Sequence, residues 1–126
     1  MPRPELHRIL LGIAASLLLA GCQDYWAGTS EPPPGDSDKG AELISSQGCG
    51  SCHIVPGIIG ADGLAGPSLE NIALRGYLAG VLPNTHDNMV QWLMDPPAVD
   101  PLTAMPDLGL TRAQATDIAA YLDTLK

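Results

Sequence analysis

Two cysteines and a histidine stand within five consecutive residues, Cys49-Gly50-Ser51-Cys52-His53. A spacing of two residues places both thiols on one turn of chain, where they can form thioether bonds to the two vinyl groups of a single haem. The adjacent His53 then faces the iron. This pattern is the signature of c-type haem attachment and is more specific than Cys-x-x-Cys alone. It predicts one covalent haem c, with Cys49, Cys52 and His53 as cofactor-binding residues and His53 as an iron ligand.

Two other kinds of site use the same residue types. A zinc site needs two further Cys or His ligands at finger or ribbon spacing, and after the first 22 residues only His53 and His86 remain. A thioredoxin-like dithiol follows a strand and is surrounded by a sheet, whereas a Gly-rich loop follows Cys52 and no strand pattern is visible. The sequence favours haem and leaves both alternatives open.

The second axial ligand of the iron decides between electron transfer and chemistry at an open site. The candidates are Met89, Met94, Met105 and His86. Met89 and Met94 lie on a predicted helix, where a methionine more often packs in the core. Met105 lies in an irregular loop bounded by prolines, far along the chain from His53, and such a loop can cover the opposite haem face. Met105 is therefore the predicted metal ligand, and His86 is predicted to be a solvated surface residue.

Composition limits what else the chain can do. A length of 126 residues leaves room for one domain and excludes a two-domain enzyme. Aromatic residues make up only 4% and Phe is absent, so something other than side chains is expected to complete the core. The formal charge is −8, so the chain lacks the excess of basic side chains that nucleic-acid binding requires. Fourteen Gly and twelve Pro favour loops and turns over long regular elements.

The first 21 residues have the layout of a secretory signal peptide. A basic head precedes an uncharged, mostly apolar run from Ile9 to Ala20, which is too short for a membrane-spanning helix of about 20 residues. The stretch Leu19 to Cys22 resembles the lipobox of bacterial lipoproteins, which implies cleavage before Cys22 and lipidation of that residue. An ordinary signal peptide followed by a free cysteine is the alternative. Either signal predicts export to the periplasm or the cell exterior.

A composition change after Cys22 predicts a linker and then a folded domain. Residues 22–37 are rich in Gly, Ser, Thr, Pro and acidic residues, and they include Pro32-Pro33-Pro34. Such a segment cannot bury enough apolar surface to offset the entropy of ordering it. It is interpreted as a flexible tether between a lipid anchor and a domain over residues 38–126.

Three helices are predicted within this domain. The first runs from Asp38 to Gln47, with Asp36 or Ser37 as its cap. The second begins near Asn84, whose side chain caps it, and ends at Met94 because two prolines follow. The third starts at a capping box formed by Thr111 and Gln114 and carries apolar residues at helical spacing: Ala115, Ile118, Ala119, Leu122 and Leu125.

The remaining segments are predicted to be loops. Residues 54–66 contain a glycine at every third position from 57 onward, which is typical of irregular chain. A turn of helix is expected around residues 69–74. Alternating patterns that would predict strands are absent.

The domain resembles the small class I c-type cytochromes from Asp38 to Lys126. Besides the Cys-x-x-Cys-His run, the loop Gly66-Pro67-Ser68-Leu69 is similar to the family loop in which the proline carbonyl accepts a hydrogen bond from the ligand histidine. Trp92 matches the family tryptophan that packs beside the haem and donates its N–H to a propionate. Arg75 is a looser match to a residue that serves the other propionate. The resemblance thus adds Pro67, Trp92 and Arg75 as cofactor-binding residues.

The resemblance extends to the terminal helices. Gly40 and Tyr121 look like the pair at which the first and last helices of the family cross at close range. The chain departs from the family in lacking Phe near the first helix, where Leu43 or Ile44 must fill the space. The implied fold is all-α, the cytochrome c fold, with three main helices and long loops around one covalent haem.

The implied function is single-electron transfer through a His/Met-ligated haem, without catalysis and without a small-molecule substrate. Lipid-anchored, acidic members of the family resemble respiratory carriers that work between a quinol-oxidising complex or dehydrogenase and a terminal oxidase. A tether suits that role because it raises the effective concentration near membrane-bound partners. A haem enzyme or gas sensor with a labile sixth ligand, and a haem-free lipoprotein carrying a redox dithiol, are the alternatives.

Overall fold

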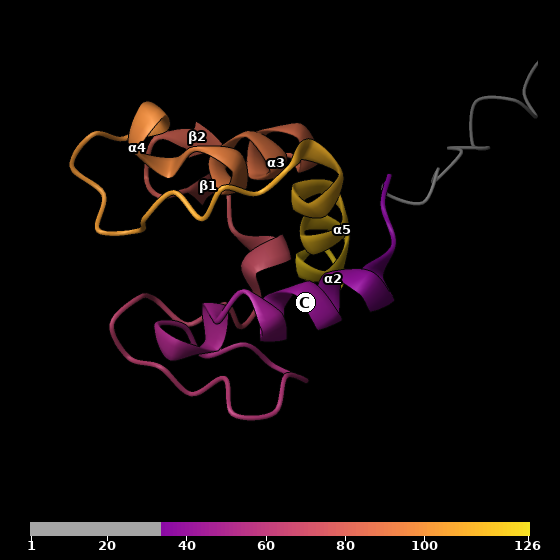
Figure 1. Ribbon diagram of the computed structural model, residues 1–126. Helices are drawn as coiled ribbons and strands as arrows, with labels where there is room; N and C mark the ends of the chain where they lie inside the picture. Colours follow the sequence, from indigo (N-terminus) through magenta and orange to yellow (C-terminus); the bar gives the residue numbers. More distant parts are fainter. Residues whose placement is uncertain (1–33) are drawn as a thin grey trace, which may run out of the picture. The chain divides into compact units, whose positions relative to one another are not determined.

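Helix α5 (Arg112–Leu122) lies between two other helices and organises the fold. Figure 1 shows it, in yellow, with α2 (Ser37–Ser46) below it and α3 (His86–Met94) above it. This computed structural model describes residues 34–126. The predicted signal peptide (residues 1–21), the lipidation candidate Cys22 and most of the predicted linker therefore lie outside the described residues.

The architecture of the described part is helical, as predicted. The elements in chain order are α2, the 3₁₀ turns η1 (Cys49–Ser51) and η2 (Ile72–Leu74), the strands β1 (Tyr77–Leu78) and β2 (Leu82–Pro83), α3, α4 (Pro96–Val99) and α5. Long irregular segments join them. The predicted all-α class is confirmed.

The first and last helices begin where their capping residues predict. The Asp36 side chain accepts hydrogen bonds from the first backbone amides of α2, at Asp38 and Lys39. Thr111 and Gln114 form the predicted capping box of α5. Both predicted starts are confirmed, because the capping signal is local and lies directly before an amphipathic stretch.

The start of α3 differs from the prediction. Thr85, not Asn84, is its N-cap, and the Thr85 hydroxyl accepts a hydrogen bond from the Asn88 amide. The Asn84 side chain instead donates to two carbonyls of an earlier segment. The predicted end at Met94 is correct, but the following prolines do not end helical structure. Asp95 caps a further short helix, α4, in which Pro96 takes the first position, where a missing N–H has no consequence.

A small amount of strand structure was also missed. Strands β1 and β2 pair antiparallel, with Tyr77 opposite Pro83 and Leu78 opposite Leu82. An isolated bridge joins Ile54 and Asp62 within the Gly-rich loop. Strands of two residues are too short for an alternating pattern, so the sequence could not reveal them.

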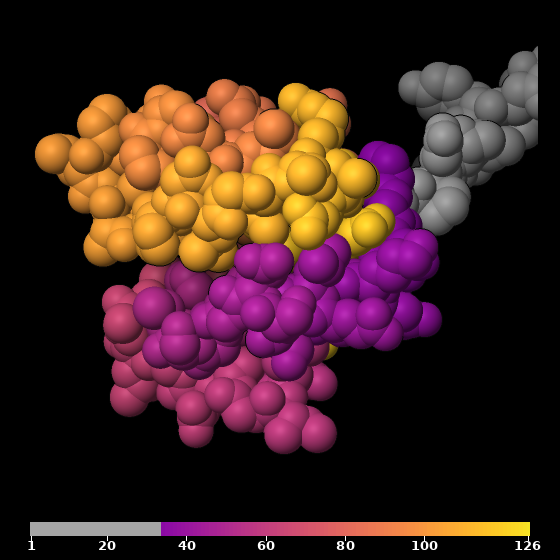
Figure 2. Space-filling model, viewed as in Figure 1, coloured from indigo at the N-terminus to yellow at the C-terminus, as the bar shows by residue number. Residues whose placement is uncertain are grey.

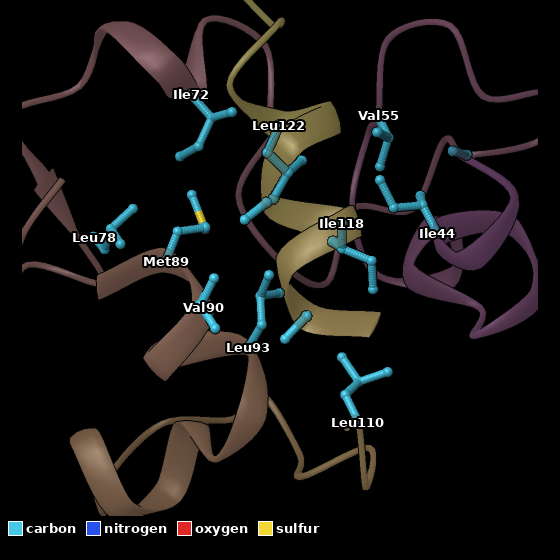
Figure 3. Packing of buried hydrophobic residues seen from close by; sticks show 13 residues of the cluster. Ile44, Val55, Ile72, Leu78, Met89, Val90, Leu93, Leu110, Ile118 and Leu122 are labelled. Atoms are coloured by element: carbon cyan, nitrogen blue, oxygen red, sulfur yellow. The ribbon is translucent and has the colours of Figure 1, made fainter. Parts of the chain in front are cut away.

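The hydrophobic core follows α5 on both of its sides (Figure 3). Ile118 and Leu122 of α5 are 1% and 3% exposed. On one side Ile44 of α2 packs with Val55. On the other side the core uses side chains of α3 and of the hairpin: Leu78, Met89, Val90 and Leu93. The buried core is almost wholly aliphatic.

Helices α2 and α5 cross at Gly40. A Cβ placed at Gly40 would lie 2.1 Å from the Asp117 carbonyl oxygen and 2.9 Å from the Tyr121 Cβ. Only a residue without a side chain lets the two backbones approach this closely. The predicted contact between Gly40 and Tyr121 is present. Because α2 leads directly into the Cys-x-x-Cys-His run, this crossing fixes where that run begins.

Candidate haem-attachment site

A left-handed glycine turns the chain from α2 into the cysteine segment. Gly48 has φ 74°, a conformation that favours glycine, and its carbonyl accepts a hydrogen bond from the Ser51 amide at 3.0 Å. The 3₁₀ turn η1 follows at once. The Cys49 carbonyl accepts from the amides of both Cys52 and His53, at 3.2 and 3.0 Å. The predicted placement of both thiols and the imidazole on one turn of chain is therefore realised.

The two thiols have different surroundings. Cys49 is half-buried and packs against the core, whereas Cys52 is exposed. Burial raises the pKa of the Cys49 thiol, so it stays protonated at neutral pH. Redox-active dithiols instead have a thiol with a lowered pKa, which is the opposite of the direction at Cys49.

His53 is held by the loop that contains Gly66 and Pro67. Its Nδ1 lies 2.7 Å from the Pro67 carbonyl oxygen, so Nδ1–H donates this bond and Nε2 is the nitrogen left to bind a metal. A Cβ at Gly66 would lie 2.4 Å from the His53 Cε1, so the ring rests directly on that backbone. The hydrogen bond expected from the Gly66-Pro67 pattern is present. A carbonyl on Nδ1 is the usual way in which proteins orient a metal-binding imidazole.

The segment that follows His53 is tied back to the cysteine turn. The Gly66 amide donates to the Cys52 carbonyl at 2.7 Å, and the Gly63 amide donates to the Gly50 carbonyl at 3.0 Å. A Cβ at Gly63 would meet the Ser51 carbonyl at 2.4 Å. Gly63 therefore allows close backbone packing against the cysteine turn, a role that the prediction of an irregular loop did not include.

Met105 lies in the segment between α4 and α5. It is half-buried, packs against the core, and its amide donates to the Thr103 hydroxyl at 3.1 Å. Met89, in contrast, is 3% exposed and belongs to the core of α3, as expected for a packing methionine. Met94 is half-buried beside that core. Of the three methionines, Met105 alone lies outside a helix, as expected for the predicted iron ligand. Its role as iron ligand stays a prediction.

The predicted propionate partners lie on different elements. Trp92 is half-buried on α3. The Arg75 guanidinium is engaged by backbone, since its Nη2 donates to the carbonyls of Ser68 and Glu70. Both propionate roles stay predictions.

His86 is not the solvated residue that the sequence suggested. Its Nδ1 lies 2.7 Å from the Asp123 Oδ2, its side chain is only 17% exposed, and its Nε2 is buried. The partner is 37 positions away, on the chain that leaves α5, so no local signal predicts it. The pair joins the start of α3 to the end of α5.

The described residues fit a haem better than a metal ion bound by side chains alone. Within residues 34–126 no group of three or more His, Cys, Asp and Glu side chains is placed to hold a metal, as a zinc site would require. Large apolar side chains are exposed on two irregular segments. Leu64, between α2 and α3, is 83% exposed, and Leu102, between α4 and α5, is 93% exposed. Figure 2 shows these segments, pink below and orange above, with an indentation between their outer ends. Exposed apolar side chains of this kind are typical of a surface that a bound group or a partner covers.

Among residues 34–126, every helix falls short of the length and hydropathy that a bilayer-spanning segment requires.

Comparison with known proteins gives three related curated chains. The chain is 31% identical over 103 residues to cytochrome c oxidase subunit 2 of Alkalihalophilus pseudofirmus and 32% identical over 92 residues to the subunit of the same name from Bacillus sp. strain PS3. These alignments cover 79% and 70% of this chain but only 29% and 26% of the two subunits. The chain thus spans less than a third of the length of these relatives.

The third relative matches over its full length. Cytochrome c-552 of Bradyrhizobium diazoefficiens is 28% identical over 121 residues, which is 96% of this chain and 99% of the relative. Residues 37–126 match the family described as Cytochrome c, from the first residue of α2 to the C-terminus. Together with the turn of cysteines and the carbonyl-bound histidine, this match shows that the chain belongs to the cytochrome c family.

Proposed function

We propose that the protein carries single electrons in a respiratory chain, at a membrane surface, through one haem c bound by Cys49 and Cys52 and ligated by His53 and Met105. Family membership gives the coarse role, an electron carrier with covalently bound haem c. The observation that carries the finer proposal is the His53 to Pro67 hydrogen bond on the cysteine turn. It leaves Nε2 as the one ring nitrogen for iron.

The chain's own residues supply binding, orientation and a fixed environment. The bound haem supplies the one-electron chemistry. The Pro67 carbonyl makes the His53 imidazole a stronger donor to iron, and a thioether ligand from Met105 favours the reduced state. His53 and Met105 would be the two side chains that hold the iron, and with both in place the protein would need no substrate site and would act as a carrier rather than an enzyme.

A terminal oxidase is the proposed acceptor. Two relatives are named cytochrome c oxidase subunit 2, and this chain resembles under a third of each. In those proteins a region similar to this chain is part of an oxidase subunit, which supports the same direction of electron flow here. A quinol-oxidising complex or a dehydrogenase is the proposed donor.

The proposed location is the outer side of a membrane. A signal peptide over residues 1–21, lipid on Cys22, a linker over residues 22–37 and a haem domain over residues 38–126 would hold the carrier there. The support is the sequence pattern before residue 34. In this proposal the haem domain faces the periplasm or the cell exterior.

An absorption spectrum of the oxidised and reduced protein tests the proposal. We expect the spectrum of low-spin c-type haem, with pigment that stays with the polypeptide after acid-acetone extraction. The Cys49→Ala, Cys52→Ala double variant is the matched control and should lose that pigment. A protein without covalent pigment would contradict the proposal. Ready binding of carbon monoxide by the reduced protein, without denaturant, would favour the haem enzyme or gas sensor instead.

A further inference from the structure

The Asn84 side chain, which lies just before α3, forms hydrogen bonds with the backbone that precedes the β1–β2 hairpin. Its Nδ2 donates to the carbonyls of Ile72 and Arg75, both at 2.8 Å. Its backbone amide donates to the Gly76 carbonyl at 3.0 Å. Asn84 therefore fixes the backbone of Arg75 from the far side of the β1–β2 hairpin.

Arg75, held in this way, reaches back along the chain. Its Nη2 donates to the carbonyls of Ser68 and Glu70. On the same peptide unit as the Ser68 carbonyl, the Leu69 amide donates to the Ile54 carbonyl at 2.8 Å. The peptide between Ser68 and Leu69 is thus held at both its oxygen and its nitrogen.

That peptide unit is next to the carbonyl that orients the haem-ligand histidine. The Pro67 carbonyl, which accepts the His53 hydrogen bond, precedes it by one residue. Peptide units are planar, so only the φ and ψ rotations of Ser68 separate the peptide that carries the Pro67 oxygen from the clamped unit. A rotation of the Ser68 backbone would therefore turn the Pro67 carbonyl oxygen away from the His53 imidazole.

We propose that Asn84 is a positioning residue for the His53 to Pro67 hydrogen bond, and that it acts through Arg75. The proposal rests on the proposed role of His53 as an iron ligand. It gives Arg75 a task at the protein backbone, besides the propionate contact expected from the family resemblance. Hydrogen-bonded partners of a metal-binding histidine set its orientation and its donor strength. Loosening this relay should weaken donation from His53 to iron and raise the midpoint potential.

The test compares three variants of the haem-loaded protein. Asn84→Ala removes both donors to the Ile72 and Arg75 carbonyls. Arg75→Lys keeps the positive charge near the haem but loses the planar guanidinium that serves two carbonyls. Asn88→Ala is the matched control, because Asn88 also lies at the start of α3 and donates a 2.8 Å hydrogen bond, to the Pro83 carbonyl.

Two readouts report on the His53 bond without measuring activity. The first is the solvent exchange rate of the His53 Nδ1 proton, followed by NMR in the reduced protein well below its melting temperature. The second is the midpoint potential from an equilibrium redox titration. We expect exchange at least several-fold faster and a potential shifted upward in Asn84→Ala and Arg75→Lys. Asn88→Ala should match the wild type in both.

The proposal is overturned if Asn84→Ala and Arg75→Lys retain the exchange rate and potential of the Asn88→Ala control. If Asn84→Ala does not fold, Arg75→Lys decides the question by the same two measurements. The double variant adds a check, since residues acting in series should give an effect no larger than the greater single one. Failure of the proposed function is seen separately, as a wild-type protein without covalent haem.

Discussion

The Tyr121 hydroxyl donates a 2.6 Å hydrogen bond to the Pro56 carbonyl, across 65 positions of sequence. Pro56 stands three residues after His53, so this bond ties the last helix to the haem-attachment segment. Gly57 makes room for it, because a Cβ there would lie 2.5 Å from the hydroxyl oxygen. The Cβ of the same tyrosine lies at the crossing with Gly40. One side chain thus joins α5 both to α2 and to the chain that holds the candidate ligand.

Replacing Tyr121 with Phe should remove this link while keeping the packing of the ring. A net loss of about 1 kcal/mol in unfolding free energy is expected for one such hydrogen bond. Chemical denaturation of the haem-loaded protein measures it. Tyr77→Phe is the matched control, because Tyr77 is 64% exposed and should be neutral. Equal denaturation midpoints for the two variants would show that the Tyr121 hydroxyl carries no net stability.

Replacing Gly40 with Ala should force α2 and α5 apart. The added methyl would overlap backbone at Asp117, which cannot move as a flexible side chain can. Overpacking of this kind costs about 1 to 3 kcal/mol. Gly76→Ala is the control, since a Cβ there meets nothing within 4 Å and its backbone is not left-handed. Thermal unfolding should show a clear decrease for the first variant and little change for the second.

Local signals predicted the two ends of the fold, and long-range contacts decided the rest. The caps of α2 and α5 could be predicted because the capping residues and the apolar spacing are adjacent in sequence, whereas the crossing at Gly40 was expected only from the family resemblance. The α3 start could not, since Asn84 and Thr85 are both good caps. The choice depends on the carbonyls of Ile72 and Arg75, which attract the asparagine.

The candidate site divides in the same way. The cysteine turn and the Pro67 carbonyl follow from a short motif and a family pattern. No sequence motif marks the hydrogen bonds of Arg75 and Asn84. Their acceptors are backbone carbonyls, which every residue type carries, so the acceptors cannot be recognised from the sequence. The pairing of His86 with Asp123 likewise depends on the packing of α3 against α5.

Replacing Met105 with Ala should remove the second axial ligand. The near-infrared charge-transfer band of methionine-ligated ferric haem should disappear and the midpoint potential should fall, because a thioether favours ferrous iron. Met94→Ala is the comparison, and Met94 is half-buried like Met105. Loss of the band in Met94→Ala alone would assign the ligand to α3 and show that Met105 is a packing residue.

Replacing Cys22 with Ser should separate membrane attachment from folding. Without the thiol no lipid can be added, so a folded cytochrome should be released or held only by an uncleaved signal. Detergent partitioning and the mass of the N-terminal peptide measure this together. A cleaved N-terminus with unchanged partitioning into detergent would argue against lipid on Cys22.

Charge should govern how the carrier meets its partners. Residues 34–126 contain eleven acidic and four basic side chains, a formal charge of −7, whereas residues 48–61 around the cysteine turn contain none of either kind. Partner docking sites are therefore predicted to be basic or largely apolar. Steering by charge is screened over about 8 Å at physiological ionic strength, so electron transfer should slow as salt rises.

A soluble fragment of residues 36–126 makes this test clean, because confinement by a tether could hide the contribution of charge steering. Second-order rates with the native oxidase or reductase are compared at low and high salt. A decrease with salt supports steering by the acidic surface. A rate that stays flat or rises would instead place the productive contact on the uncharged cysteine segment, where Ile59 is fully exposed. Ile59→Ser would then slow the reaction at every salt concentration, whereas Val81→Ser, at a half-exposed site on the hairpin, would not.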